Sequence, residues 1–89
     1  MISESRVRTA KPTEKPYRLS DGRGLYVHVV PAGGRYWRFN YRFNGRQKTL
    51  ALGIYPDVPL AKARERHQEA RRQLAEGIDP GVVKQAINS

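Results

Sequence analysis

Large apolar side chains alternate with cations and amides along the segment RYWRFNYRFNGRQKTL, residues 35–50. Strict alternation sends successive side chains to opposite faces of a β-strand, so one face of this segment is apolar and the other is polar. Asn44-Gly45, inside the segment, is a strong signal for a type I′ hairpin turn. The pattern predicts two antiparallel strands, over residues 36–43 and 46–52.

A third strand is expected at LYVHVV, residues 25–30, between the turn-forming sequences LSDGRG and PAGG. Before it, residues 3–10 allow a short helix capped by Ser3, and the proline-rich segment 11–16 is expected to be a connector.

A helix of about seventeen residues is predicted beyond IYPDVP, because one apolar stripe recurs at spacings of three and four. Gly77 is expected to end it in the position after the C-cap. The stripe consists of Leu60, Ala63, His67, Ala70 and Leu74. The predicted fold is α+β: a three-stranded antiparallel sheet packed on one carboxy-terminal helix, with an optional short amino-terminal helix.

The two-residue turn at 44–45 also fixes which residues of the hairpin share a face. The apolar face, which the helix must cover, pairs Phe43 with Arg46, Tyr41 with Lys48, Phe39 with Leu50 and Trp37 with Leu52. The opposite, polar face pairs Arg42 with Gln47, Asn40 with Thr49 and Arg38 with Ala51. Tyr26 and His28 extend this polar face if Leu25, Val27 and Val29 join the core, a parity that the PAGG loop leaves open.

The chain has a large excess of positive charge. The chain has 17 Lys and Arg against 8 Asp and Glu, a net charge of +9. Residues 23–55 contain no acid at all. Such a balance favours a polyanionic partner, and nucleic acid is the commonest one. The alternative is that a small sheet keeps one face wet and uses arginine for solubility.

Arg, Asn and Gln on a sheet that enters the major groove can hydrogen-bond to base edges, Arg to guanine and Asn or Gln to adenine. Three arginines near the strand ends would lie closer to the phosphate backbone: Arg23, Arg35 and Arg46. The residues predicted to contact DNA are Tyr26, His28, Arg35, Arg38, Asn40, Arg42, Arg46, Gln47 and Thr49.

Catalysis, metal binding and cofactor binding find no support in the sequence. Cysteine is absent, and His67 on the apolar stripe is expected to be structural, since His28 is the only other histidine and no carboxylate cluster accompanies them. Asp21 and Asp57 are expected to be a turn former and a cap. The start of the chain has no signal-peptide pattern and no window resembles a membrane span, so we expect a cytoplasmic protein that binds neither membranes nor small-molecule substrates.

The motifs KPYRLSDGRGLYV, RYWRFNYRFNGRQKTLALGIYP, LAKARERHQEAR and LAEGIDP occur in order. Together they resemble the amino-terminal arm-type DNA-binding domain of tyrosine-recombinase integrases carried by prophages and genomic islands, over roughly residues 3–80. The resemblance implies that the exposed sheet face enters the major groove of arm-type attachment sites, which supports integration and excision of a viral or mobile genome. Pro59 and His67 depart from the family pattern, which has a Ser or Thr cap and a small residue there.

The resemblance also implies that residues 1–80 form this domain. Residues 81–89 would then begin a linker to core-binding and catalytic domains outside this chain, so that the chain is not itself an enzyme. Expected partners are double-stranded DNA, on which it would act in a bacterial host, and other integrase subunits through the full-length protein. Two alternatives stay open: a protein-interaction module for an acidic partner or another recombinase subunit, and RNA binding with Tyr26 stacked on an unpaired base.

Overall fold

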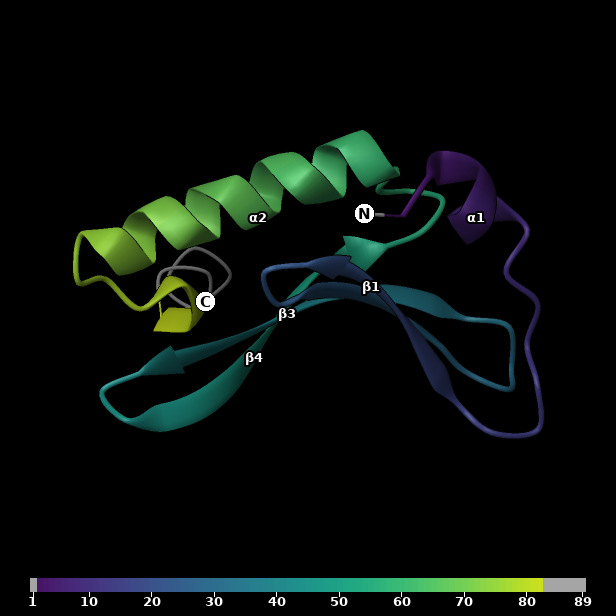
Figure 1. Ribbon diagram of the computed structural model, residues 1–89, viewed down its shortest axis with the longest axis horizontal. Helices are drawn as coiled ribbons and strands as arrows, with labels where there is room; N and C mark the ends of the chain where they lie inside the picture. The colour runs from purple at the N-terminus through teal and green to yellow at the C-terminus, as the bar shows by residue number, and fades with distance from the viewer. Residues whose placement is uncertain (1, 83–89) are drawn as a thin grey trace.

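The computed structural model describes residues 2–82 and shows one sheet with a long helix across it (Figure 1). The sheet is antiparallel, with strands in the order β1-β2-β3-β4. The elements are α1 (Glu4–Arg8), β1 (Tyr17–Gly22), β2 (Leu25–Val29), β3 (Arg35–Phe43), β4 (Arg46–Ile54) and α2 (Leu60–Ala75). The α+β class, the antiparallel sheet and the carboxy-terminal helix are confirmed. Residues 83–89, which include most of the expected linker, lie outside the described residues.

The sheet has four strands, so the prediction of three was wrong. The missed strand, β1, alternates in the expected way, because Tyr17 and Leu19 are partly buried whereas Arg18 and Ser20 are exposed. It was missed because LSDGRG, which overlaps the end of this strand, was interpreted as a turn sequence. The turn itself is only Arg23-Gly24, both with positive φ (53° and 87°), as in the hairpin turns that join two antiparallel strands.

The hairpin of β3 and β4 forms as predicted, with positive φ at Asn44 (53°) and Gly45 (76°). Six of the seven expected pairs are confirmed, from Phe43↔Arg46 to Arg38↔Ala51. The seventh is wrong: Trp37 pairs with Gly53 rather than Leu52, because the register shifts between Trp37 and Arg38. This irregularity inserts one residue into β4, which runs on to Ile54.

The core lies between the sheet and α2. Trp37 is fully buried there, and its Nε1 donates a hydrogen bond to the Val58 carbonyl at 2.7 Å. His67 is buried as well, edge-on to Phe39 at a ring-centroid distance of 4.8 Å, with Nε2 3.0 Å from the Arg23 carbonyl oxygen. The structural role expected of His67 is therefore confirmed.

The ends of the helices show how the departure at Pro59 is accommodated. Pro59 occupies the N-cap of α2 and supplies no side-chain bond, and Asp57 does not cap the helix as expected. Instead the Glu4 carboxylate accepts a hydrogen bond from the Leu60 amide at 3.0 Å. Glu4 is the first residue of α1, a helix whose N-cap is Ser3. A carboxylate at this position satisfies a free amide and complements the helix dipole.

At the other end of α2, Gly77 (φ 80°) takes the predicted position. Its amide bonds the Leu74 carbonyl, and the Ile78 amide bonds the Gln73 carbonyl, as in a Schellman motif. The chain then returns toward the hairpin, where Asp79 is buried and accepts hydrogen bonds from Tyr41 (2.6 Å) and Lys48.

Candidate nucleic-acid interface

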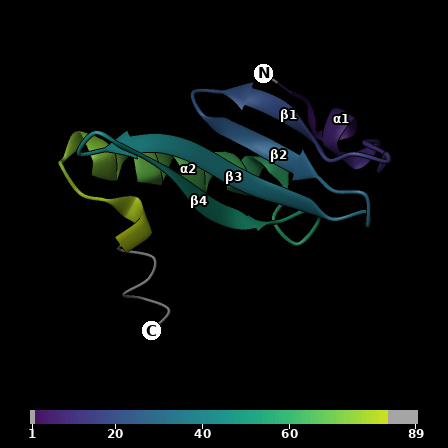
Figure 2. The same cartoon turned by 90° about the horizontal axis from the view of Figure 1, so that it is seen from below.

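One face of the sheet is left uncovered. The helices lie on the other side, so that a view from below shows the strands in front of α2 (Figure 2). The strand register places a continuous set of side chains on the uncovered face. From β1 to β4 they are Arg18, Ser20, Tyr26, His28, Tyr36, Arg38, Asn40, Arg42, Gln47, Thr49, Ala51 and Ile54. We call this set the open face.

The open face carries three arginines and no acid among its residues. Two of them lie over aromatic rings: the Arg18 guanidinium carbon is 4.8 Å from the Tyr26 ring centroid, and that of Arg38 is 5.8 Å from the Tyr36 centroid. Such contacts orient a guanidinium without neutralising its charge. The positive potential of this face is therefore available to a ligand.

A shallow hollow opens where β3 and β4 approach their turn. It is lined by Asn40, Tyr41, Arg42 and Gln47. Asn40 and Thr49 are joined by a hydrogen bond from the Thr49 hydroxyl to Asn40 Oδ1 at 2.9 Å. Arg42 and Gln47 are exposed, so this part of the face offers donors and acceptors to a molecule laid against it.

Five of the nine predicted contact residues come together here. These are Arg38, Asn40, Arg42, Gln47 and Thr49. The predicted parity of β2 is confirmed, since Tyr26 and His28 share the face, opposite Arg38 and Tyr36.

Tyr26 and His28 are less accessible than their position on the open face suggests. Tyr26 is only 6% exposed and lies beneath Arg18. Its ring is therefore not an open platform on which an unpaired RNA base could stack. Burial, together with the charges of Arg38 and Arg18, lowers the pKa of His28, whose Nδ1 is buried with no partner in the described part of the chain.

Arg35 and Arg46 do not belong to the open face, because they pair with Val29 and Phe43 on the helix side. The Arg35 guanidinium donates to the Val7 and Arg8 carbonyls at 3.4 and 3.3 Å, which ties β3 to α1. Arg46 is exposed at the tip of the hairpin. Both residues therefore lie on the opposite face of the sheet from Arg42.

Sequence reasoning missed the contribution of β1 to the open face. Arg18 and Ser20 are exposed there, and Arg18 adds the third arginine. The alternation in YRLS was the available signal, and the adjacent turn residues obscured it. Tyr36 and Ile54 were also missed, the latter because β4 was expected to end at Leu52.

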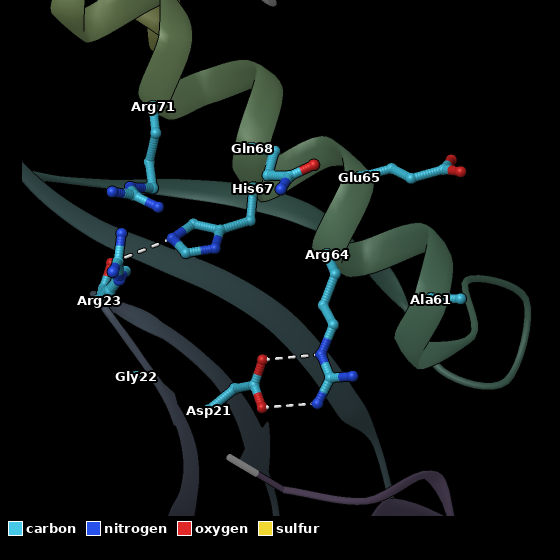
Figure 3. Close-up of a pocket in the computed structure, with 9 residues that line it drawn as sticks. All are labelled: Asp21, Gly22, Arg23, Ala61, Arg64, Glu65, His67, Gln68 and Arg71. Atoms are coloured by element: carbon cyan, nitrogen blue, oxygen red, sulfur yellow. Dashed lines mark hydrogen bonds and ion pairs between the residues drawn. The ribbon is translucent and has the colours of Figure 1, made fainter.

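A second hollow lies on the helix side, between α2 and the turn that joins β1 and β2. Figure 3 shows Asp21 and Arg64 facing each other across it, and His67 pointing toward the Arg23 backbone. Both oxygens of Asp21 accept from Arg64 at 3.0 Å, and the Ile2 amide donates to Asp21 at 2.9 Å. Asp21 is thus a buried ion-pair partner rather than only a turn former. Within residues 2–82, no group of three or more His, Cys, Asp or Glu could hold a metal ion.

Residues 2–87 match the family model described as the Arm DNA-binding domain. The chain is an arm DNA-binding domain. The integrase of Shigella phage Sf6 is 42% identical over 89 residues, which are all of this chain and 23% of the phage protein. The integrase of Enterobacteria phage P4 is 44% identical over 85 residues, 93% of this chain and 19% of that protein. The prophage integrase IntS of Escherichia coli K12 is 42% identical over the whole chain.

This arm DNA-binding domain spans about a fifth of the length of the integrases it matches. Membership of this family indicates a role in DNA binding during integration and recombination. No helix in residues 2–82 is long and apolar enough to cross a membrane.

Proposed function

We propose that this domain binds double-stranded DNA sequence-specifically by laying its open face in the major groove of arm-type attachment sites. The observation that carries the proposal is the uncovered, acid-free face on which three arginines accompany Asn40, Gln47 and Thr49. The major groove is about 12 Å wide and admits a β-ribbon, and its base edges offer acceptors that arginine and amide donors match.

The residues divide into two roles by their position. Four residues of the open face would contact base edges: Arg38, Asn40, Arg42 and Gln47. Arg23 and Arg46 lie at exposed turns, where a phosphate backbone would pass the rim of the sheet. Arg18, above Tyr26, is at the opposite edge of the face and would contact the other side of the groove.

In the full-length protein, the domain would hold a tyrosine recombinase on sites that flank the recombination core, and other integrase subunits would bind alongside. The chemistry of strand exchange would belong to a catalytic domain outside this chain. We therefore expect this domain alone neither to cleave nor to join DNA.

Competition binding at fixed salt tests the proposal. A duplex from the attachment region of the parent element should compete better than random duplex DNA, and random duplex better than single-stranded RNA or an acidic polypeptide. Stronger competition by the acidic polypeptide would replace the proposal with a protein-interaction role. Stronger competition by RNA would favour the other alternative, which the covered ring of Tyr26 argues against.

A further inference from the structure

Two hydroxyl groups, from the strands on either side of β3, donate to the side-chain amide oxygen of Asn40. Its Oδ1 accepts hydrogen bonds from Thr49 Oγ1 at 2.9 Å and from the Tyr26 hydroxyl at 3.3 Å. An amide oxygen has two lone pairs, so these two bonds use its accepting capacity. The Nδ2 group, with two N–H donors, has no acceptor among residues 2–82. The side chain lines the hollow beside Arg42 and Gln47.

The backbone around Asn40 is closely packed. Asn40 and Thr49 are direct cross-strand partners in the register of β3 and β4, and the backbone N–H of Asn40 donates to the Gly24 carbonyl at 2.9 Å. A side chain at Gly24 would place its Cβ 2.3 Å from the Asn40 carbonyl oxygen, so the backbones are in close contact. Tyr26 is held beneath Arg18. The two hydroxyls thus come from residues on the neighbouring strands β2 and β4.

Gln47 provides a contrast on the same hollow. It is exposed, pairs with Arg42 in the register, and has no side-chain hydrogen bond within the described residues. Its amide keeps both a free acceptor and free donors. It can therefore form the two-bond pair with the N6 and N7 positions of adenine that amide side chains favour.

We infer that Asn40 reads the major groove as a donor only. It contacts base acceptors, such as O6 and N7 of guanine, N7 of adenine or O4 of thymine, and does not accept from the adenine amino group. Tyr26 and Thr49 are positioning residues that fix this choice through their hydroxyls. The inference rests on the proposed function and specifies the hydrogen-bonding role of one residue within it.

The first step of the test locates the base pair that Asn40 contacts. Binding sites are selected from a pool of random duplexes with the wild-type domain, Asn40→Ala and, as the matched control, Gln47→Ala. We expect Asn40→Ala to relax the preference at one position or two adjacent positions, and Gln47→Ala to relax a different one. A wild-type preference that Asn40→Ala leaves intact at every position would overturn the inference while leaving the proposed function standing.

The second step asks which group of the base Asn40 contacts. At the located position, a duplex with adenine is compared with one carrying unsubstituted purine, which lacks the 6-amino group but keeps N7. Wild-type affinity should change less than about twofold, because Oδ1 is already engaged. The double variant Tyr26→Phe/Thr49→Val frees Oδ1, so its affinity should fall about tenfold when the amino group is removed.

Two results at this step would overturn the inference. One is a loss of about tenfold for the wild type on removing the amino group, which would show that Oδ1 accepts from the base. The other is a double variant as insensitive as the wild type, which would show that the hydroxyls do not fix the amide. Thermal unfolding of each variant confirms that the fold persists, and the single variant Thr49→Val serves in place of the double variant if Tyr26→Phe fails to fold.

If the wild type selects no sequence at all, the proposed function itself fails, and that outcome is distinct from a failure at Asn40 alone.

Discussion

The two faces of the sheet use charge in opposite ways. On the helix side the buried acids are paired: Asp21 with Arg64, and Asp79 with Lys48 and Tyr41. Burial alone would raise the pKa of Asp79, but hydrogen bonds from Lys48 and Tyr41 outweigh it and lower the pKa. Burial, with the bond to Asp79, in turn raises the pKa of Tyr41 to about 12. These pairs hold separate segments of the chain together.

The open face has cations without acids. Its arginines rest on aromatic rings or extend into solvent, and nothing on that face neutralises them. An unpaired charge in solvent contributes little to folding, and these arginines are available to a partner. The comparison therefore predicts that helix-side substitutions act on stability and open-face substitutions act on binding.

The largest expected effect is that of salt on DNA binding. If roughly four to six cations meet phosphates, log K should fall against log salt with a slope of about −4 to −5, which is roughly a 250- to 1,000-fold loss between 50 and 200 mM. Stability should change far less, because the helix-side pairs are partly buried. Titrations of a labelled duplex at several salt concentrations measure the slope. A slope near zero would indicate a protein-interaction role instead.

Asp21→Ala should have the next largest effect, on stability. The substitution leaves the Ile2 amide without its acceptor and leaves the Arg64 guanidinium with only the Ile2 carbonyl among residues 2–82. Breaking a buried pair costs about 3–5 kcal/mol, and Arg64 is partly exposed and can rehydrate, so we expect about 2–3 kcal/mol. Urea unfolding measures the loss. The folded variant should bind DNA like the wild type, and a loss of affinity without a loss of stability would contradict the division between the faces.

Arg42→Ala should change binding and spare stability. Arg42 is exposed at mid-face opposite Gln47, so we expect about 1–3 kcal/mol of lost affinity on the specific site and much less on random DNA. Arg72→Ala is the matched control. Arg72 lies on α2, bonded to Glu69 and Glu76 on the exposed helix surface, and its loss should alter neither binding nor stability by much.

Equal weakening on both DNAs would make Arg42 a phosphate contact and move base recognition to Arg38, Asn40 or Gln47. If no open-face substitution distinguishes the two DNAs, the wrong face has been chosen.

Local patterns were enough to predict most of this geometry. Period-two alternation and the Asn44-Gly45 turn give the hairpin register and hence the grouping of Arg38, Asn40 and Arg42, because a tight turn leaves no freedom in pairing. The bulge beside Trp37 was not predictable in this way. It places Gly53 opposite Trp37, where a Cβ would lie 2.4 Å from the Val58 side chain, a contact with the loop that follows the strand.

Long-range contacts account for what else was missed. The bond from the Leu60 amide to Glu4 joins residues 56 positions apart, and no local pattern indicated that the Arg35 guanidinium would donate to carbonyls of α1. The hydroxyl bonds to Asn40 involve three strands at once. Periodicity identifies the face on which a side chain lies, and it does not show which of its atoms are already bonded.

The smallest expected effect is the pH dependence of stability, which tests the role of His67 on the helix side of the sheet. Burial, helped by the charge of Arg71 and opposed by the bond to the Arg23 carbonyl, lowers the pKa of His67. The unfolded chain, with a histidine pKa near 6.5, then binds more protons than the folded one. The contribution of His67 to the free energy of unfolding is therefore complete above about pH 6.5 and is lost as pH falls through the folded pKa. One histidine can contribute at most about 1.4 kcal/mol between about pH 7.5 and 5.5.

We expect urea unfolding of His67→Gln, which can still donate to the Arg23 carbonyl, to depend less on pH over this range than the wild type. His28 has a lowered pKa too, so His28→Gln is the matched variant on the open face. If only His28→Gln flattened the profile, the open face rather than the core would be the pH-sensitive part of the fold.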